Sequence, residues 1–315
     1  MISNPDPRIN ISLQHLRQLE GPARGLSFLP RQPAKSILNG QHASRLRGRG
    51  LNFEELRRYL PGDDIRSIDW KATARKREPH VRVYTEERDR PTLVIVDQRQ
   101  SMFFGTSHCM KSVTAAEVAA VTAFRVLAKG DRIGGIVFDD KRVDEFKPQR
   151  SRRALYALLK DIEKKNQALS ADNPPVTEPM PLNQPLQAAS RIARHDHLIV
   201  VVSDFDGIDD ETHRHVTTLA RGNDVCLMLI HDPWARDMPR GLDIVASDGQ
   251  LQVSLDTTTE KTWRRLNKAS RNRLQNIIDW QSTSGVTVFP ITTGESTIPQ
   301  LQKLLGGTPS RRKFT

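Results

Sequence analysis

The sequence predicts an α/β fold: a doubly wound, mostly parallel sheet flanked by helices, with a small N-terminal extension that contains β-structure. Two observations carry this prediction. From residue 91 onward, apolar runs of five to eight residues alternate with segments of helical periodicity. Such alternation is typical of βαβ units whose sheet is buried on both faces. In addition, two of the apolar runs end in a carboxylate, Asp97 and Asp204, at the edge where such sheets bind ligands.

The part of the chain before residue 91 has a different character. Residues 1–50 are rich in Pro, Gly and Arg and read as irregular, with one short helix at 11–19. Residues 53–60 are expected to form two helical turns, which Pro61 and Gly62 would end. Residues 80–86 alternate polar and apolar side chains, which predicts a half-buried strand.

The elements after residue 91 follow from the same patterns. We expect strands at residues 92–97, 131–138, 197–204, 224–231 and 286–292, helices at 112–129, 151–168, 182–194, 209–221, 258–282 and 298–305, and a hairpin with strands at 242–246 and 251–255. The predicted organisation is a basic extension at 1–90, an α/β domain at 91–306 and a basic tail at 307–315.

Composition excludes several classes of protein. A hydrophobic content of 37% with 27% charged residues is typical of a soluble globular protein, and no apolar run reaches the roughly 20 residues of a membrane span. Two cysteines, Cys109 and Cys226, are too few for a disulfide scaffold or a four-cysteine zinc site. The sequence lacks a P-loop motif, so we do not expect it to hydrolyse ATP as a P-loop enzyme. We expect a cytoplasmic protein.

The positive charge is concentrated at the start of the chain. Residues 1–90 carry +7 of the formal net charge of +11. Nucleic acid, an anionic membrane surface or an acidic protein partner could each account for this excess, as could solubility and local counter-ions. Because a helix-turn-helix, a zinc motif and an aromatic-rich stacking strand are all missing from the pattern, no nucleic acid is expected as the partner.

Three carboxylates are the candidate ligands at the sheet edge. Asp97, Asp204 and Asp206 offer the hard oxygen atoms that Mg²⁺ requires. The alternative is that aspartates at strand ends simply cap the following turn or helix.

A longer motif precedes the first of these strands. The run Arg58-Tyr-Leu-Pro-Gly-Asp-Asp-Ile-Arg-Ser-Ile-Asp-Trp-Lys-Ala-Thr-Ala-Arg75, followed by a short strand and Val94-Ile-Val-Asp97, resembles the bacterial domain of unknown function 58 family. The resemblance covers residues 20–300 and implies a von Willebrand A-like domain after the signature. It also implies an interaction or adaptor role beside MoxR-type AAA+ ATPases and other von Willebrand A proteins, without an established catalytic activity.

Von Willebrand A domains are known for an adhesion-type metal site, and the resemblance places its positions here. The first element, Asp-x-Ser-x-Ser, is matched by Asp97 and Ser101, but Arg99 stands where the first Ser belongs. Asp204 matches the late aspartate. The expected Thr is missing, and Asn183 is the nearest oxygen donor. The resemblance therefore implies a degenerate metal site.

Arg99 changes the chemistry expected at that site. A guanidinium is permanently charged, so it can pair the carboxylates directly and repel a divalent cation. We therefore expect a site without metal and no other cofactor, with Arg99 as the counter-ion. The alternative is that Arg99 points outward and a weaker Mg²⁺ site survives.

The signature has two interpretations. In the first it braces the fold: Pro61-Gly62 forms a turn, Arg66, Asp69 and Arg75 form an ion-pair network, and Trp70 packs against the α/β domain. In the second it is a partner-docking surface that acts through its charged residues. The residues singled out by both are Arg58, Gly62, Asp63, Asp64, Arg66, Asp69, Trp70 and Lys71.

The function predicted from these observations is that of a non-enzymatic adaptor. It would work with a MoxR-type AAA+ ATPase in the assembly, maturation or stress protection of other proteins. The alternatives are a nucleic-acid-binding protein that uses the basic extension, or a metal-dependent hydrolase that uses Asp97 and Asp204.

Overall fold

The computed structural model describes residues 6–26, 51–86, 90–174, 176–236, 239, 243–247, 252–256 and 260–305. The chain divides into two compact units, one formed by residues 1–30 with 90–315 and the other by residues 31–89. The expected boundary at residue 90 therefore marks only one side of the smaller unit, because the first 30 residues group with the α/β unit instead of the extension.

The larger unit is built on a six-stranded sheet with the order β10-β7-β6-β3-β4-β5. These strands are β3 (Thr92–Asp97), β4 (Ile133–Phe138), β5 (Val143–Gln149), β6 (Leu198–Ser203), β7 (Asp224–His231) and β10 (Thr287–Thr292). Neighbouring strands are parallel except for β4 and β5, which are antiparallel. This confirms the predicted α/β class and the mostly parallel sheet.

The strand order places a topological switch point in the middle of the sheet. Within this sheet the chain enters at β3 and runs outward through β4 to β5. It then returns to β6, on the other side of β3. In doubly wound sheets, ligands bind beyond the carboxyl ends of the two strands that flank such a reversal. The carboxyl ends of β3 and β6 are therefore the first place to look for a site.

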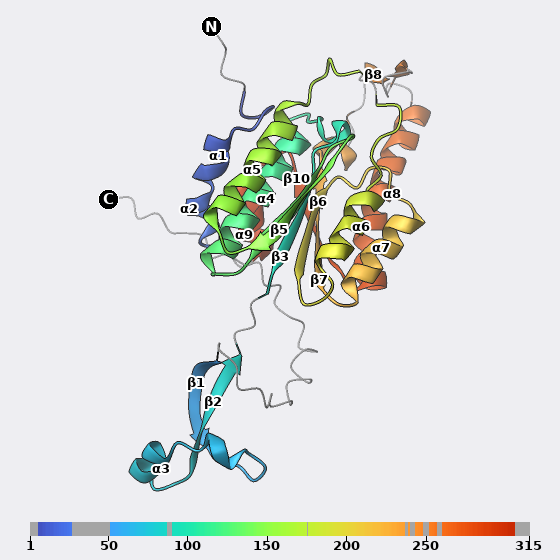
Figure 1. Ribbon diagram of the computed structural model, residues 1–315. Coiled ribbons are helices and arrows are strands. Elements are labelled where there is room, and N and C mark those ends of the chain that lie inside the picture. Colours follow the sequence, from blue (N-terminus) through green and yellow to red (C-terminus); the bar gives the residue numbers. More distant parts are fainter. Residues whose placement is uncertain are drawn as a thin grey trace, which may run out of the picture. The chain divides into compact units, whose positions relative to one another are not determined.

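Helices cover both faces of this sheet (Figure 1). One face packs against α4 (Lys111–Ala128), α5 (Arg152–Gln167) and α9 (Thr297–Leu305), and the other against α6 (Asn183–Ile192), α7 (Asp210–Ala220) and α8 (Glu260–Ser284). Because both faces are covered, every residue of β3, β4 and β6 is buried. This burial explains why these strands are continuous apolar runs.

Strand β5 was not expected from the sequence. Its segment, Val-Asp-Glu-Phe-Lys-Pro-Gln, is charged, contains a proline and keeps no fully buried residue. Pro148 is tolerated there because β5 is an edge strand, which has one side free of ladder hydrogen bonds. The composition of this segment argues against a strand, and its pairing with β4 is what makes it one.

The N-terminal segment lies against α4 and α5. The predicted helix at 11–19 is present as two short helices, α1 (Leu13–Gln18) and α2 (Glu20–Ala23). The backbone N–H of Ile11 donates to Asn166 Oδ1 at 2.7 Å, and His15 Nε2 lies 2.7 Å from Glu117 Oε1. These contacts reach more than 100 residues along the chain, which local sequence patterns cannot indicate.

The smaller unit contains an antiparallel pair, β1 (Leu51–Arg58) and β2 (His80–Glu86), and the helix α3 (Trp70–Lys76). The strand predicted at 80–86 is confirmed, whereas the helix predicted at 53–60 is wrong. Residues 51–58 pair with β2 along their length, and this pairing overrides the helix propensity of Glu, Leu and Arg. The missed helix α3 begins after its N-cap, Asp69, which accepts hydrogen bonds from the backbone of Lys71 and Ala72.

The remaining predicted elements are present with small shifts of boundary. The hairpin in the last third pairs β8 (Asp243–Ser247) with β9 (Gln252–Asp256), while its turn lies outside the described residues. The irregular stretch at 27–50 and the basic tail at 307–315 also lie outside them. Among the helices that the structure describes, none is long and apolar enough to cross a membrane.

Candidate functional site

The two predicted strand-end carboxylates lie side by side at the switch point. Asp97 is the last residue of β3, Asp204 directly follows β6, and these two strands are hydrogen-bonded neighbours. Asp97 is fully buried and Asp204 is 5% exposed. Buried carboxylates need hydrogen-bonding or ionic partners, since removal from water otherwise disfavours the charged form strongly.

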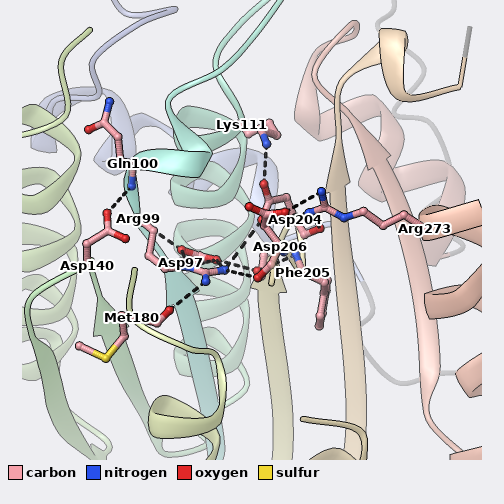
Figure 2. Close-up of polar contacts among 11 residues, drawn as sticks. Asp97, Arg99, Gln100, Lys111, Asp140, Met180, Asp204, Phe205, Asp206 and Arg273 are labelled. Carbon is pink, nitrogen blue, oxygen red and sulfur yellow. Dashed lines mark hydrogen bonds and ion pairs between the residues drawn. The ribbon is translucent and has the colours of Figure 1, made fainter. Parts of the chain in front are cut away.

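Arg99 supplies those partners to Asp97. Its backbone N–H donates to Asp97 Oδ1 at 3.0 Å, its Nε lies 3.1 Å from the same oxygen, and its Nη2 donates to Oδ2 at 2.7 Å. Figure 2 shows the guanidinium reaching beyond Asp97, where Nη1 donates to the carbonyl of Met180 at 2.9 Å and Nη2 to that of Asp206 at 3.2 Å. Arg99 is itself only 3% exposed, so its side chain is directed into the protein.

Other groups complete the surroundings of this pair. Ser203 Oγ donates to Asp97 Oδ2 at 2.7 Å and accepts from the backbone N–H of Phe205 at 2.8 Å. The Arg99 guanidinium also stands over the Phe138 ring, 5.5 Å from its centroid. Burial alone would lower the pKa of Arg99, but the charge and hydrogen bonds of Asp97 outweigh burial and raise it above its ordinary value. Asp97 and Arg99 therefore form a buried ion pair.

Asp204 is matched by a second set of cations. Lys111 Nζ donates to Asp204 Oδ2 at 2.5 Å, while Arg99 Nη2 and Arg273 Nη2 each lie 4.0 Å from Oδ1. The backbone N–H of Asp206 donates to Oδ1 at 3.0 Å. Burial would raise the pKa of Asp204, but the charges of Lys111 and Arg273 outweigh burial and hold it below its usual value. Asp204 is therefore held as a carboxylate.

Two of these cations were missed by sequence reasoning. Lys111 is the first residue of the helix that follows β3, and in a βαβ unit that end of the helix lies at the same sheet edge as the end of the strand. This relationship could have identified Lys111. Arg273 lies on α8, and its Nη1 pairs with Asp206 Oδ1 at 2.7 Å. No local pattern indicates this contact.

The other positions of the adhesion-type pattern are not brought to the carboxylates. Ser101 Oγ is buried and makes no hydrogen bond within the described part of the chain. Asn183, the nearest substitute for the missing Thr, instead donates to both Asp209 oxygens at 3.2 Å and accepts from Thr212 Oγ1 at 2.6 Å. In the described part of the chain, neither side chain is hydrogen-bonded to Asp97 or Asp204.

The donor set at this edge does not fit a divalent metal ion. Both carboxylates already face cationic nitrogens at hydrogen-bonding distance, so a cation placed between them would meet Arg99 and Lys111. Within the described ranges no group of three His, Cys, Asp or Glu side chains is arranged to hold a metal ion. A catalytic role of Asp97 as a free base also conflicts with this geometry, since its two oxygens accept hydrogen bonds from Arg99 and Ser203.

The signature residues lie in the smaller unit and are braced differently from the predicted network. Arg57 holds Asp63 through two hydrogen bonds of 2.7 Å, and Arg58 pairs with Glu78 at 2.5 Å. In the part of the chain that the structure describes, Arg66 and Arg75 form no ion pair, so the network expected among Arg66, Asp69 and Arg75 is absent.

The aromatic residue of the signature is Trp70, whose side chain is 67% exposed. Its packing against the α/β domain stays a prediction. The turn prediction agrees with the backbone, because Gly62 has a φ of 107°, in the region that favours glycine. Asp64 caps the short 3₁₀ turn Ile65–Ser67 by accepting from the backbone of Arg66. Lys71 is exposed.

The fold and this site define a doubly wound α/β protein whose switch point holds a self-neutralised cluster of charges. Residues 55–276 match the family model described as "Protein of unknown function DUF58", and the chain belongs to that family. Uncharacterized proteins of Mycobacterium bovis and Mycobacterium tuberculosis are 28% identical to it over 258 residues, which are 81% of this chain and 79% of theirs.

Two solved structures similar to this chain are von Willebrand A domains. The SpRpn10 VWA domain aligns with a TM-score of 0.36 at 12% identity, covering 68% of this chain and 94% of that domain. A von Willebrand factor type A protein from Catenulispora acidiphila aligns with a TM-score of 0.36 at 12% identity, covering 71% of this chain and 43% of that protein.

Proposed function

We propose that this protein is a non-enzymatic interaction adaptor that works in the cytoplasm with a MoxR-type AAA+ ATPase, in the assembly, maturation or stress protection of other proteins. One observation carries the proposal. At the sheet edge where doubly wound proteins place their ligands, Asp97 and Asp204 are each occupied by a cation of the same chain. Both carboxylates are buried and already paired within the chain, which supports a structural role for this edge and not turnover at it.

The sequence supports the assignment of ATP hydrolysis to the partner and not to this chain. The chain has no P-loop motif, so any ATP-driven step would belong to the partner. Family membership leads to the same proposal, because the resemblance that identified the family implies an ATPase of the MoxR type beside such proteins.

The proposal is tested by mixing the purified full chain with each MoxR-type ATPase of its own organism and measuring the mass of the complex by light scattering. The mixtures contain ATP, ADP, a non-hydrolysable ATP analogue or no nucleotide. A P-loop ATPase of an unrelated family is the matched control. A stable complex with a MoxR-type ATPase alone is the expected result. If no complex forms in any nucleotide state, the adaptor proposal fails.

We also propose that the switch-point edge works without a metal ion, with Arg99 as its built-in counter-ion. The support is the 2.7 Å contact between Arg99 Nη2 and Asp97 Oδ2, both buried. Calorimetric titration of the full chain with Mg²⁺ and Mn²⁺ should give no stoichiometric heat. Tight binding that is abolished by Asp97→Ala would overturn the proposal.

A further inference from the structure

Between β1 and α3 the chain makes a short excursion, residues 60–68, which we call the signature loop. Both its ends are tied to the segment that leads into β2. Tyr59 N donates to the carbonyl of Pro79 at 2.8 Å, and Asp69 N donates to that of His80 at 2.8 Å. The loop and α3 lie at one end of the β1–β2 ribbon (Figure 1). The base of the loop is therefore closed by backbone hydrogen bonds.

The interior of the loop is held by its own carboxylates. Asp63 accepts from the backbone N–H of Leu60 at 2.8 Å and from both terminal nitrogens of Arg57 at 2.7 Å. Asp64 accepts from the backbone N–H of Arg66 at 2.9 Å. Both acids therefore fix the shape of the loop, and Asp63 is paired with Arg57, while the Asp64 side chain stays exposed.

The side chains that this loop presents to solvent are apolar. Leu60 is 59% exposed, Ile65 63% and Trp70, directly after the loop, 67%. Among the side chains whose burial the structure describes, only two other large hydrophobic ones are exposed, so three of these five fall within residues 60–70. Exposed apolar side chains gathered on an ordered surface mark interaction sites, and tryptophan is prominent among the residues that dominate binding energy. A loop already held in shape also loses little entropy on binding.

The exposed charges around these side chains are mostly positive. Five exposed cations on and just after the loop form no ion pair with any described residue: Arg66, Lys71, Arg75, Lys76 and Arg77. A partner surface complementary to this region would be acidic and would carry an apolar pocket.

We propose that the signature loop together with α3 is a docking surface for an acidic protein segment, with Trp70 inserted into an apolar pocket of the partner. The proposal rests on the interaction role proposed above and names the chemistry of the partner. A protein fits better than a nucleic acid, because Leu60 and Ile65 are aliphatic and offer no ring on which a base could stack. Exposed cations alone would suit an acidic protein or a nucleic acid. The exposed aliphatic side chains of Leu60 and Ile65 favour the protein.

The test uses the full chain as bait for a display library of random 15-residue peptides. Peptides that combine Asp or Glu with large apolar residues should be enriched, and Trp70→Ala should weaken their binding at least about tenfold. The charge reversal Arg66→Glu/Lys71→Glu should weaken binding further and remove most of its salt dependence. Trp70 is exposed, so the melting temperature should not change in Trp70→Ala, and circular dichroism verifies that it folds.

Matched variants on the larger unit control for general effects. Phe104→Ala removes another exposed aromatic residue, and Arg153→Glu/Lys160→Glu makes the same change of charge on α5. These variants should leave peptide binding unchanged. The proposal is overturned if no acidic, apolar peptides are enriched, if the controls weaken binding as much as Trp70→Ala, or if single-stranded DNA binds through Trp70 with steep salt dependence instead. Because no ATPase is present, these outcomes are independent of whether the MoxR-type complex forms.

Discussion

The guanidinium of Arg99 lies directly on the carboxylate of Asp97, two residues earlier in the chain, with 2.7 Å between Nη2 and Oδ2 and both side chains buried. A buried ion pair is costly to break, since removing one partner leaves an uncompensated charge. The pair also links three segments, because the same guanidinium bonds the carbonyls of Met180 and Asp206. Arg99 is thus a structural centre of the switch point.

Arg99→Ala should destabilise the protein by about 3–5 kcal/mol, because it removes one partner of a buried ion pair and leaves the Asp97 side chain buried without its cation. Urea denaturation followed by circular dichroism measures the change in free energy of unfolding. Arg142→Ala, which removes an exposed arginine side chain, is the matched control and should change stability by less than about 0.5 kcal/mol. Equal unfolding midpoints for the two variants would contradict this account.

Arg99→Ser should create a divalent cation site at the switch point. The substitution removes the guanidinium from Asp97 and restores the pattern Asp-x-Ser-x-Ser, so carboxylate and hydroxyl oxygens become available as ligands. Calorimetric titration should detect Mn²⁺ binding of about millimolar affinity. The double variant Arg99→Ser/Asp97→Ala should abolish it. A folded Arg99→Ser protein with no affinity for Mn²⁺ would show that Arg99 is not what excludes the metal.

The docking of the N-terminal segment should weaken as pH rises. The hydrogen bond to Glu117 raises the pKa of His15, outweighing the effect of burial, which lowers it. A raised pKa in the folded state means that the stabilisation is fully present below the unfolded value of about 6.5. It is lost as pH rises through the higher folded pKa.

Thermal melts of the native chain and of His15→Gln between pH 5 and 9 measure this contribution. The difference in stability between them should be largest at the acid end and shrink toward alkaline pH. His195→Gln, which alters an exposed histidine, should leave the pH dependence as it is in the native chain. A constant difference across the range would assign His15 a packing role only.

Lys165→Met should destabilise the protein by about 1–3 kcal/mol. Lys165 is buried on α5, and its Nζ lies 2.8 Å from both Asp139 Oδ2 and Asp144 Oδ2, so it joins the helix to the loop between β4 and β5 and to β5 itself. Its loss would leave two carboxylates close together without their common cation. The adjacent Lys164→Met, on the exposed side of the same helix, is the control. Chemical denaturation of both variants makes the comparison, and equal stabilities would contradict the prediction.

A strand of this fold can be predicted from the sequence when it is buried on both faces of the sheet. The central strands, such as β3 and β6, are buried on both faces, so each is a continuous apolar run that can be recognised locally. Strands β1 and β5 contain charged residues and are held by pairing with a neighbour, so local patterns predict a helix for the first and no strand for the second. Edge and hairpin strands are determined by their partners more than by their own composition.

Some residues of the candidate site can be named from the sequence, and others are brought to it only by packing. The carboxylates Asp97 and Asp204 and the cation Arg99 could be named from the sequence, because a strand end and a family pattern are local features. Arg273 could not, since α8 reaches the site from about 70 residues beyond Asp204, and only packing of that helix brings the guanidinium to the edge. For Trp70 the sequence left bracing and docking both open, and the 67% exposure of its side chain became known only from the fold of its segment.

The sequence by itself determined the α/β class, the family and the identity of the charges at the strand ends, because each of these is written in short-range periodicity or in a contiguous motif. Only the tertiary structure decided which way those charges face. Arg99 turns inward onto Asp97, Lys111 and Arg273 converge on Asp204, and Trp70 remains in solvent. The physical reason is that ion pairing and burial depend on segments distant in the chain, whose approach is set by packing of the whole sheet and its helices.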